Sequence, residues 1–279
     1  MADVFIGSEA VTAGRVTKYD LRARYRRILP DVYGPLGSPP TLFERTVATW
    51  LWSDRQGVIT GLAASALHGA KWVDVDSVIE LNGYDRKPPA GVSTRIETLH
   101  PDEIEMRCGL AVTTVDRTAF DLARRGPVGR AVERLDALAA ARDFKADDVL
   151  AVGRRHPHVR GLRRVPRILG MVDAGAQSPK ETWLRLLLID AGFPPPQTQI
   201  PVPGPDGYPR YFLDMGWPEL MVAVEYDGEQ HRVDRDIYRN DLSRSEYIAQ
   251  CGWTRIRVIA GDQRPGIVHR VRRVWPLAR

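Results

Sequence analysis

The 279-residue sequence lacks the features that mark secreted and membrane proteins. It has only two cysteines, Cys108 and Cys251, which are isolated thiols without metal-ligand spacing. No apolar run approaches the length of a membrane helix. The first residues lack the basic region and apolar stretch of a secretory signal. These absences predict a cytoplasmic protein in a reduced compartment, with no membrane partner.

Lysine is also scarce, because arginine supplies most of the 40 basic residues. The formal net charge is +5 and the isoelectric point is near 9.3, which favours nucleic acid over acidic partners. Arginine suits phosphate binding, but a GC-rich coding bias would give the same preference, so the ratio decides nothing by itself. The apolar fraction of 43% suffices for packed cores, and the length predicts roughly two domains.

Three acidic residues, Asp214, Glu225 and Asp227, lie within otherwise apolar runs of residues 211–228. A turn signal at residues 216–219 separates two predicted strands. With an even number of turn residues, Asp214 and Glu225 are diagonal neighbours on one face, with Cα atoms roughly 7–8 Å apart. Asp227 shares that face because it follows Glu225 by two residues.

Carboxylates gathered on a half-buried sheet repel one another, so we expect a cation between them. Mg²⁺ or Mn²⁺ fits, bound through one or two carboxylates, waters and phosphate oxygens. The acids Asp214, Glu225 and Asp227 are therefore predicted to form a nuclease metal site. The alternative is that they only solubilise a sheet edge, since Asp227 and Gly228 are also an ordinary turn pair.

Several motifs occur in the order found in one family. They are Asp214, Glu225-Tyr-Asp-Gly-Glu-Gln-His231, Asp241-Leu-Ser-Arg244 and Gly252-Trp-Thr-Arg-Ile-Arg257. Residues 178–275 thereby resemble the restriction-endonuclease-like domain related to the very-short-patch-repair endonuclease, in the PD-(D/E)xK superfamily. The resemblance implies that Asp214 and Glu225 bind metal.

The resemblance also assigns roles to neighbouring residues. Asp227 stands where the superfamily has a lysine that orients the attacking water, and aspartate is usual there in the subfamily that the chain resembles. Lys180 is a candidate for a migrated ammonium group. His231 resembles a histidine that assists the metal-bound water, although a lone histidine is more often a polar surface residue.

Glu181 has two interpretations. The superfamily often places a glutamate on its first helix near the metal, and Glu181 has the right position in the order. The segment Ser178-Pro-Lys-Glu181 is equally a capping box with proline at the first helical position. On the helix predicted at residues 234–250, Arg235 and Arg239 share a face that either binds scissile-strand phosphates or is simply solvated.

The N-terminal residues have the outline of a winged helix-turn-helix. Short helices are predicted at residues 8–13 and 18–24, followed by two strands around Pro30 and Asp31. Four arginines around Tyr25 offer phosphate contacts, unless they are only a solvated face; they are Arg22, Arg24, Arg26 and Arg27. Residues 5–125 resemble the N-terminal domain of AbiEi-type antitoxins, which implies a possible toxin partner.

The sequence predicts a winged-helix module with its helical extension at residues 1–90 and a mostly helical connector at 91–175. An α/β, restriction-endonuclease-like domain, with a mixed sheet flanked by helices, is expected at 176–279. The favoured function is Mg²⁺-dependent hydrolysis of double-stranded DNA. The alternative is an AbiEi-like antitoxin or autoregulating repressor whose nuclease fold is catalytically inactive.

Overall fold

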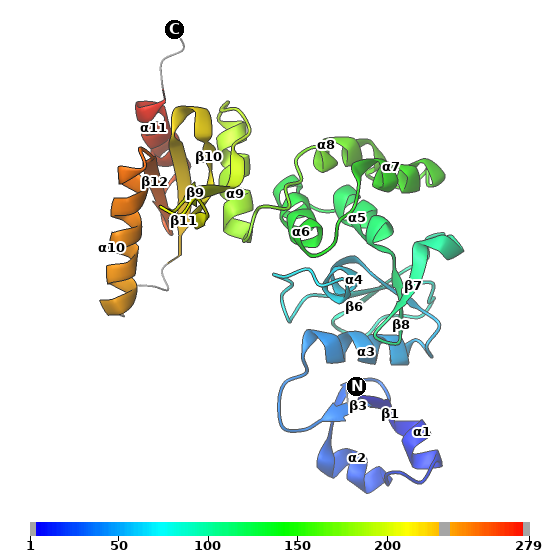
Figure 1. The fold of residues 1–279 in the computed structure, drawn as a ribbon. Helices are drawn as coiled ribbons and strands as arrows, with labels where there is room; N and C mark the ends of the chain where they lie inside the picture. Colours follow the sequence, from blue (N-terminus) through cyan, green and yellow to red (C-terminus); the bar gives the residue numbers. More distant parts are fainter. Residues whose placement is uncertain (1–3, 229–234, 276–279) are drawn as a thin grey trace. The chain divides into compact units, whose positions relative to one another are not determined.

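The computed structural model describes residues 4–228 and 235–275. The chain forms two compact units, an N-terminal unit of residues 1–172 and a C-terminal unit of residues 173–279. Both are mixed α/β structures in which helices flank the sheets (Figure 1). Within the described residues, no helix combines the length and the apolar character needed to cross a membrane.

The N-terminal unit begins with a small three-stranded antiparallel sheet of order β1-β3-β2. Its elements are β1 (Phe5–Ile6), α1 (Gly7–Thr12), α2 (Lys18–Arg24), β2 (Tyr25–Leu29) and β3 (Val32–Pro35). Thr17 starts α2 through a capping box, since its hydroxyl accepts from Asp20 N at 3.1 Å and Asp20 accepts from Thr17 N at 3.0 Å. The predicted helices and strand pair are confirmed.

The rest of this unit is built on a five-stranded mixed sheet of order β6-β5-β4-β8-β7. The strands are β4 (Val58–Thr60), β5 (Ile79–Asn82), β6 (Val92–Arg95), β7 (Ile104–Arg107) and β8 (Leu110–Thr113). The helices are α3 (Leu42–Trp52), α4 (Gly61–Leu67), α5 (Val115–Arg124), α6 (Val128–Ala141), α7 (Ala146–Arg155) and α8 (Val165–Leu169). Strands β4 and β5 come before residue 90 and β6, β7 and β8 come after it, so one sheet spans the boundary predicted between residues 90 and 91.

The C-terminal unit contains a four-stranded mixed sheet of order β12-β11-β10-β9, in which only β11 and β12 run parallel. Its strands are β9 (Gln197–Pro203), β10 (Pro209–Trp217), β11 (Val222–Asp227) and β12 (Thr254–Ile259). Its helices are α9 (Pro179–Asp190), α10 (Arg235–Gln250) and α11 (Arg264–Val274). The mixed sheet flanked by helices is thus as predicted.

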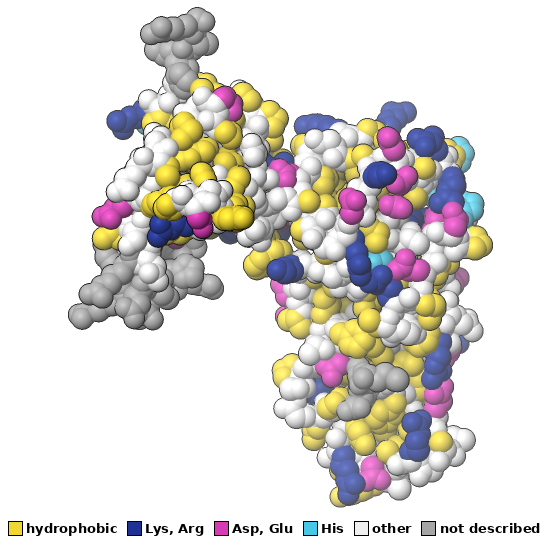
Figure 2. Space-filling model, in the orientation of Figure 1, with side chains coloured by type: hydrophobic (Ala, Val, Ile, Leu, Met, Phe, Trp, Pro, Cys, Tyr) yellow, Lys and Arg dark blue, Asp and Glu magenta, His cyan; other side chains and the backbone are white. Residues whose placement is uncertain are grey.

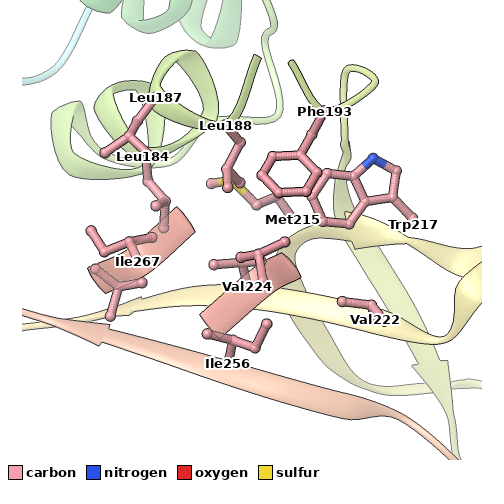
Figure 3. Packing of buried hydrophobic residues seen from close by; sticks show 12 residues of the cluster. Leu184, Leu187, Leu188, Phe193, Met215, Trp217, Val222, Val224, Ile256 and Ile267 are labelled. Atoms are coloured by element: carbon pink, nitrogen blue, oxygen red, sulfur yellow. The ribbon is translucent and has the colours of Figure 1, made fainter. Parts of the chain in front are cut away.

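Apolar side chains cover both faces of this sheet. On one face, Leu184 and Leu188 of α9 and Ile267 of α11 pack against Val224 and its neighbours (Figure 3). On the opposite face, Ile248 of α10 packs with buried residues of the sheet. Figure 1 accordingly shows α9 and α10 on opposite sides of the strands. The sheet is therefore the middle layer of a three-layer arrangement.

The turn between β10 and β11 lies later than its sequence signal indicates. We expected the turn to begin at Gly216, but β10 continues through Trp217 and the turn is a 3-10 segment at Pro218–Leu220. Trp217 is only 2% exposed, and its Nε1 donates to the Pro194 carbonyl at 3.0 Å. Burial of this large ring and its hydrogen bond extend the strand up to the proline.

Candidate functional site

The two central acids of the prediction meet where β10 and β11 separate. Met215 pairs with Val224 in the antiparallel register, so Asp214 comes opposite Glu225 rather than diagonal to it. Regular pairing ends at this position, and Oδ2 of Asp214 instead accepts a hydrogen bond from Tyr226 N at 2.9 Å. The carboxylate of Asp214 therefore links β10 to β11 just beyond their last regular pair.

Glu181 joins this pair from the first turn of α9. Its backbone N–H donates to Ser178 Oγ at 3.1 Å, and its own Oε2 accepts from Gln177 N at 2.9 Å. Glu181 is 9% exposed, and burial raises the pKa of its carboxyl group. Glu181 thus contributes to the helix start and also lies close enough to Asp214 to raise the pKa of Asp214, while its role beside a metal stays a prediction.

Asp214 has the most perturbed carboxyl group of this region. Burial, followed by the negative charges of Glu181 and Glu225, raises the pKa of Asp214 from 3.8 to about 7. The Tyr226 amide and Arg244 oppose this shift without cancelling it. Near neutral pH, this carboxyl group therefore either keeps its proton or binds a cation. We refer to Glu181, Asp214 and Glu225 as the carboxylate cluster.

Glu225 is held by two arginines that the sequence prediction did not assign to it. It is 5% exposed; its Oε1 accepts from Arg244 at 2.6 Å and its Oε2 accepts from Arg255 at 3.0 Å. Alternation along β12 could have revealed Arg255, because Ile256 and Val258 are buried against the core, as predicted, and the arginines face away from it. Arg244 was present in the sequence motif, but its partner depends on how α10 packs.

Asp227 lies two residues after Glu225 on β11 and has a different partner. Arg257 donates to Asp227 Oδ2 and also to Asp241 Oδ2 of α10, the latter at 2.9 Å. Asp227 therefore belongs to an ion-paired group of its own, although it lines the same open pocket as Asp214 and Glu225, with a volume of about 1220 Å³.

The charges around this pocket do not balance. Among the described residues, five carboxylates, when ionised, face four guanidinium groups; they are Glu181, Asp214, Glu225, Asp227 and Asp241, against Arg210, Arg244, Arg255 and Arg257. The difference is one negative charge. In the part of the chain that the structure describes, the excess lies on Asp214 and Glu181, since neither forms an ion pair with an arginine or lysine there.

This donor set suits Mg²⁺ in its chemistry, because carboxylate oxygens are the ligands that this ion prefers. Asp214 and Glu181 would hold such an ion, with Glu225 beside them. The three acids predicted as ligands, Asp214, Glu225 and Asp227, do not bring oxygens within 4.8 Å of one another among the described residues. The same holds for the carboxylate cluster of Glu181, Asp214 and Glu225 among the described residues.

A second group of possible ligands, in the N-terminal unit, already contains a cation. Ligand atoms of His100, Glu103 and His156 lie within 4.8 Å of one another. Arg117 is 1% exposed, and its Nη1 lies 2.6 Å from Glu103 Oε2 and 3.1 Å from His156 Nε2. Arg155 also pairs with Glu103 at 2.8 Å. Guanidinium groups thus take the place of a metal ion, and we interpret the group as a structural ion-pair network.

The predicted DNA-binding arginines of the N-terminal unit lie on α2 and β2. Arg22, Arg24 and Arg27 are exposed and Arg26 is half-buried. Arg26 and Arg27 line a small pocket of about 150 Å³ with Arg45 of α3. On the face that Figure 2 shows, dark blue Lys and Arg side chains of this end alternate with acidic ones instead of forming a continuous patch.

Three predicted residues have no described side chain. His231 lies outside the described residues altogether. Arg235 and Arg239 belong to α10, but the structure does not describe their side chains. Lys180, by contrast, is exposed on α9, and its Nζ lies 5.8 Å from the centroid of the Tyr226 ring. Lys180 therefore lies beside Tyr226, which follows Glu225 in β11.

Two proteins of Mycobacterium tuberculosis are similar to this chain. They are "Uncharacterized protein MT2308" of strain CDC 1551 / Oshkosh and "Uncharacterized protein Rv2248" of strain ATCC 25618 / H37Rv. Each is 28% identical over 233 residues, which cover 81% of this chain and 82% of the relative. No protein-family model matches the chain, and no solved structure matches it significantly. The similarity extends over most of the chain and carries no stated activity.

Proposed function

We propose that this protein binds double-stranded DNA and that its C-terminal unit hydrolyses phosphodiester bonds with Mg²⁺ or Mn²⁺. The observation that carries the proposal is the carboxylate cluster, in which burial and two neighbouring acids raise the pKa of Asp214 to about 7. Perturbed carboxylates that line an open pocket are typical of functional sites. The order of these residues also matches the restriction-endonuclease-like domain that the sequence resembles.

The residues of the pocket have separate tasks in this proposal. Asp214, Glu181 and Glu225 hold the divalent ion, which would activate a water molecule and stabilise developing negative charge. Arg244, Arg257 and the exposed Arg210 line the same pocket and offer guanidinium groups to the phosphates of the strand. The N-terminal unit, which we infer to be a winged helix-turn-helix of AbiEi type, adds phosphate contacts through Arg22, Arg24, Arg26 and Arg27.

Incubation with supercoiled plasmid tests this function. We expect nicking that requires Mg²⁺ or Mn²⁺, stops with chelator, and is abolished by Asp214→Asn and by Glu225→Gln while DNA affinity remains. Nicking that persists in both variants would indicate a contaminant or another site. If pure wild-type protein nicks under neither metal, the hydrolase proposal is wrong.

A second function is favoured by one specific observation. Both oxygens of Glu225 already accept from arginines, so the acid is fully paired without a metal. A nuclease fold that only binds DNA, as in an AbiEi-like antitoxin or autoregulating repressor, would retain an acid that is paired in this way. In that case the wild-type protein binds DNA and represses its own promoter but does not nick plasmid, and a neighbouring toxin gene becomes the expected partner.

A further inference from the structure

Arg244 has three partners, which lie on two strands. Its Nη2 lies 2.6 Å from Glu225 Oε1 and 2.9 Å from the carbonyl oxygen of Phe212, and its guanidinium carbon lies 5.9 Å from the centroid of the Tyr211 ring. The side chain reaches from α10 to β10 and β11 and lines the open pocket. It is therefore the arginine that joins the carboxylate cluster to the pocket surface.

The two arginines that hold Glu225 differ in how much of their side chains is exposed and in their other contacts. The side chain of Arg255 is 9% exposed and also donates to Ser245 Oγ, so it is enclosed. The side chain of Arg244 is 29% exposed, and its contacts with Phe212 and Tyr211 do not involve Glu225. Arg244 can thus leave the carboxylate toward the open pocket and keep its contacts with β10, whereas Arg255 is enclosed.

We propose that Arg244 is an exchangeable counter-ion, which competes with a divalent cation for Glu225 and, once displaced, binds a phosphate of a nucleic acid strand in the same pocket. This rests on the proposed function, because it assumes that the cluster binds a metal. The charges favour the exchange: among the described residues the pocket has one more carboxylate than guanidinium groups, and a released guanidinium is a strong bidentate partner for phosphate. Metal binding and strand binding then support each other.

A purely structural role for Arg244 predicts the opposite effect of its removal. If Arg244 only fixes Glu225, then Arg244→Gln disorders the ligand and weakens metal binding. If Arg244 competes with the metal, the same substitution removes the competitor and strengthens metal binding. The sign of the change in metal affinity therefore separates the two roles without any measurement of catalysis.

The experiment titrates Mn²⁺ into full-length protein by calorimetry and measures duplex DNA affinity in Ca²⁺ and in chelator. For Arg244→Gln we expect about tenfold tighter Mn²⁺ binding than in wild type, which corresponds to about 1.4 kcal/mol. We also expect loss of the affinity gain for DNA that Ca²⁺ gives to wild type. Arg264→Gln is the matched control, because it removes one exposed arginine paired with Asp190; it should change neither quantity.

Arg244→Lys serves if the glutamine variant does not fold, since it keeps the charge but loses the bidentate fork. It should bind Mn²⁺ as wild type does and lose part of the Ca²⁺-dependent gain in DNA affinity; an unchanged gain would overturn the proposal. Equal or weaker Mn²⁺ binding by Arg244→Gln overturns the exchange alone, provided that wild type nicks plasmid. If Asp214→Asn binds Mn²⁺ as well as wild type does, the cluster is no metal site and both proposals fail.

Discussion

The backbone N–H of Tyr226 donates to Oδ2 of Asp214 across 2.9 Å, at the position where β10 and β11 stop pairing. A hydrogen bond to the ionised form normally lowers the pKa of a carboxyl group. Here burial and the charges of Glu181 and Glu225 outweigh it, and the pKa of Asp214 rises to about 7. The folded protein therefore contains a carboxyl group whose ionisation opposes folding.

The first prediction concerns pH and stability in chelator. Asp214 has a folded pKa of about 7 and an ordinary value of 3.8, so the folded state binds more protons between these values. Its contribution to stability consequently falls as pH rises from about 4 to about 7, by at most about 4 kcal/mol. We expect Asp214→Asn to raise the melting temperature relative to wild type more at pH 8 than at pH 5.

Asp190→Asn is the control for this measurement, because Asp190 is an exposed acid of the same unit. Its effect should not depend on pH in this range. An Asp214→Asn variant that is less stable than wild type at pH 8 would show that the carboxylate contributes favourably to folding, against the assigned shift.

The second prediction concerns Lys180, whose ammonium group lies over the Tyr226 ring. If this lysine replaces the ammonium that the superfamily has at the position of Asp227, then Lys180→Ala should lower the nicking rate at saturating DNA by about 100-fold, the scale of proton-transfer assistance. Lys145→Ala, an exposed lysine of the N-terminal unit, is the control. Equal rates for the two variants would exclude Lys180 from the chemistry.

The third prediction concerns DNA contacts by the N-terminal unit. Each phosphate contact contributes about 0.9 to the slope of log affinity against log salt concentration, so Arg26→Ala with Arg27→Ala should lower that slope by about 1.8. The control pair is Arg130→Ala with Lys145→Ala, which removes the same charge from α6 and from the start of α7. If both pairs change the slope equally, β2 does not contact DNA.

Arg124 and Arg125 would be unsuitable for that control. Arg124 is 6% exposed and pairs with Asp121 at 2.8 Å, and Arg125 pairs with Glu80 and Glu97. Their removal would alter folding before it altered binding. The position of these residues at the end of a helix gave no indication of this burial.

The fourth prediction concerns Arg117, which pairs with Glu103 at 2.6 Å and with Asp121 at 3.1 Å. All three are 1% exposed. Arg117→Met removes the most buried cation of this network, and Glu103 and Asp121 keep only their contacts with Arg155, Arg124 and Arg125, so the free energy of unfolding should fall by about 3 kcal/mol. Arg130→Ala, which breaks an exposed pair with Glu133, should cost about 1 kcal/mol or less. Urea unfolding measures both; similar losses would mean that the network contributes little.

Local patterns predicted much of the secondary structure. The capping sequences at Thr17 and Ser178 start α2 and α9, and strict alternation places Ile256 and Val258 inside. The order of the acids also indicated that Asp214 and Glu225 come together. These features depend on neighbours in sequence or on one turn, which is why a pattern can reveal them.

Partners from distant segments could not be predicted in the same way. Arg244 reaches Glu225 only because α10 packs across the sheet. The pKa of Asp214 depends on its burial and on the charges of Glu181 from α9 and Glu225 from β11. The buried network of Arg117 gave no signal either, because its arginine looks like any surface residue of α5. Long-range packing, rather than local propensity, determines these contacts.

The parallel pairing of β11 with β12 has a consequence for how the chain selects its native strand alignment. Glu225 lies opposite Arg257 in the register, and Asp227 and Arg255 lie two residues away on the same side of the two strands. A slip of β12 by one residue would turn both arginines into the apolar layer and expose Ile256 and Val258. The charged residues on this side thus favour the native register of β12 over one shifted by a single residue.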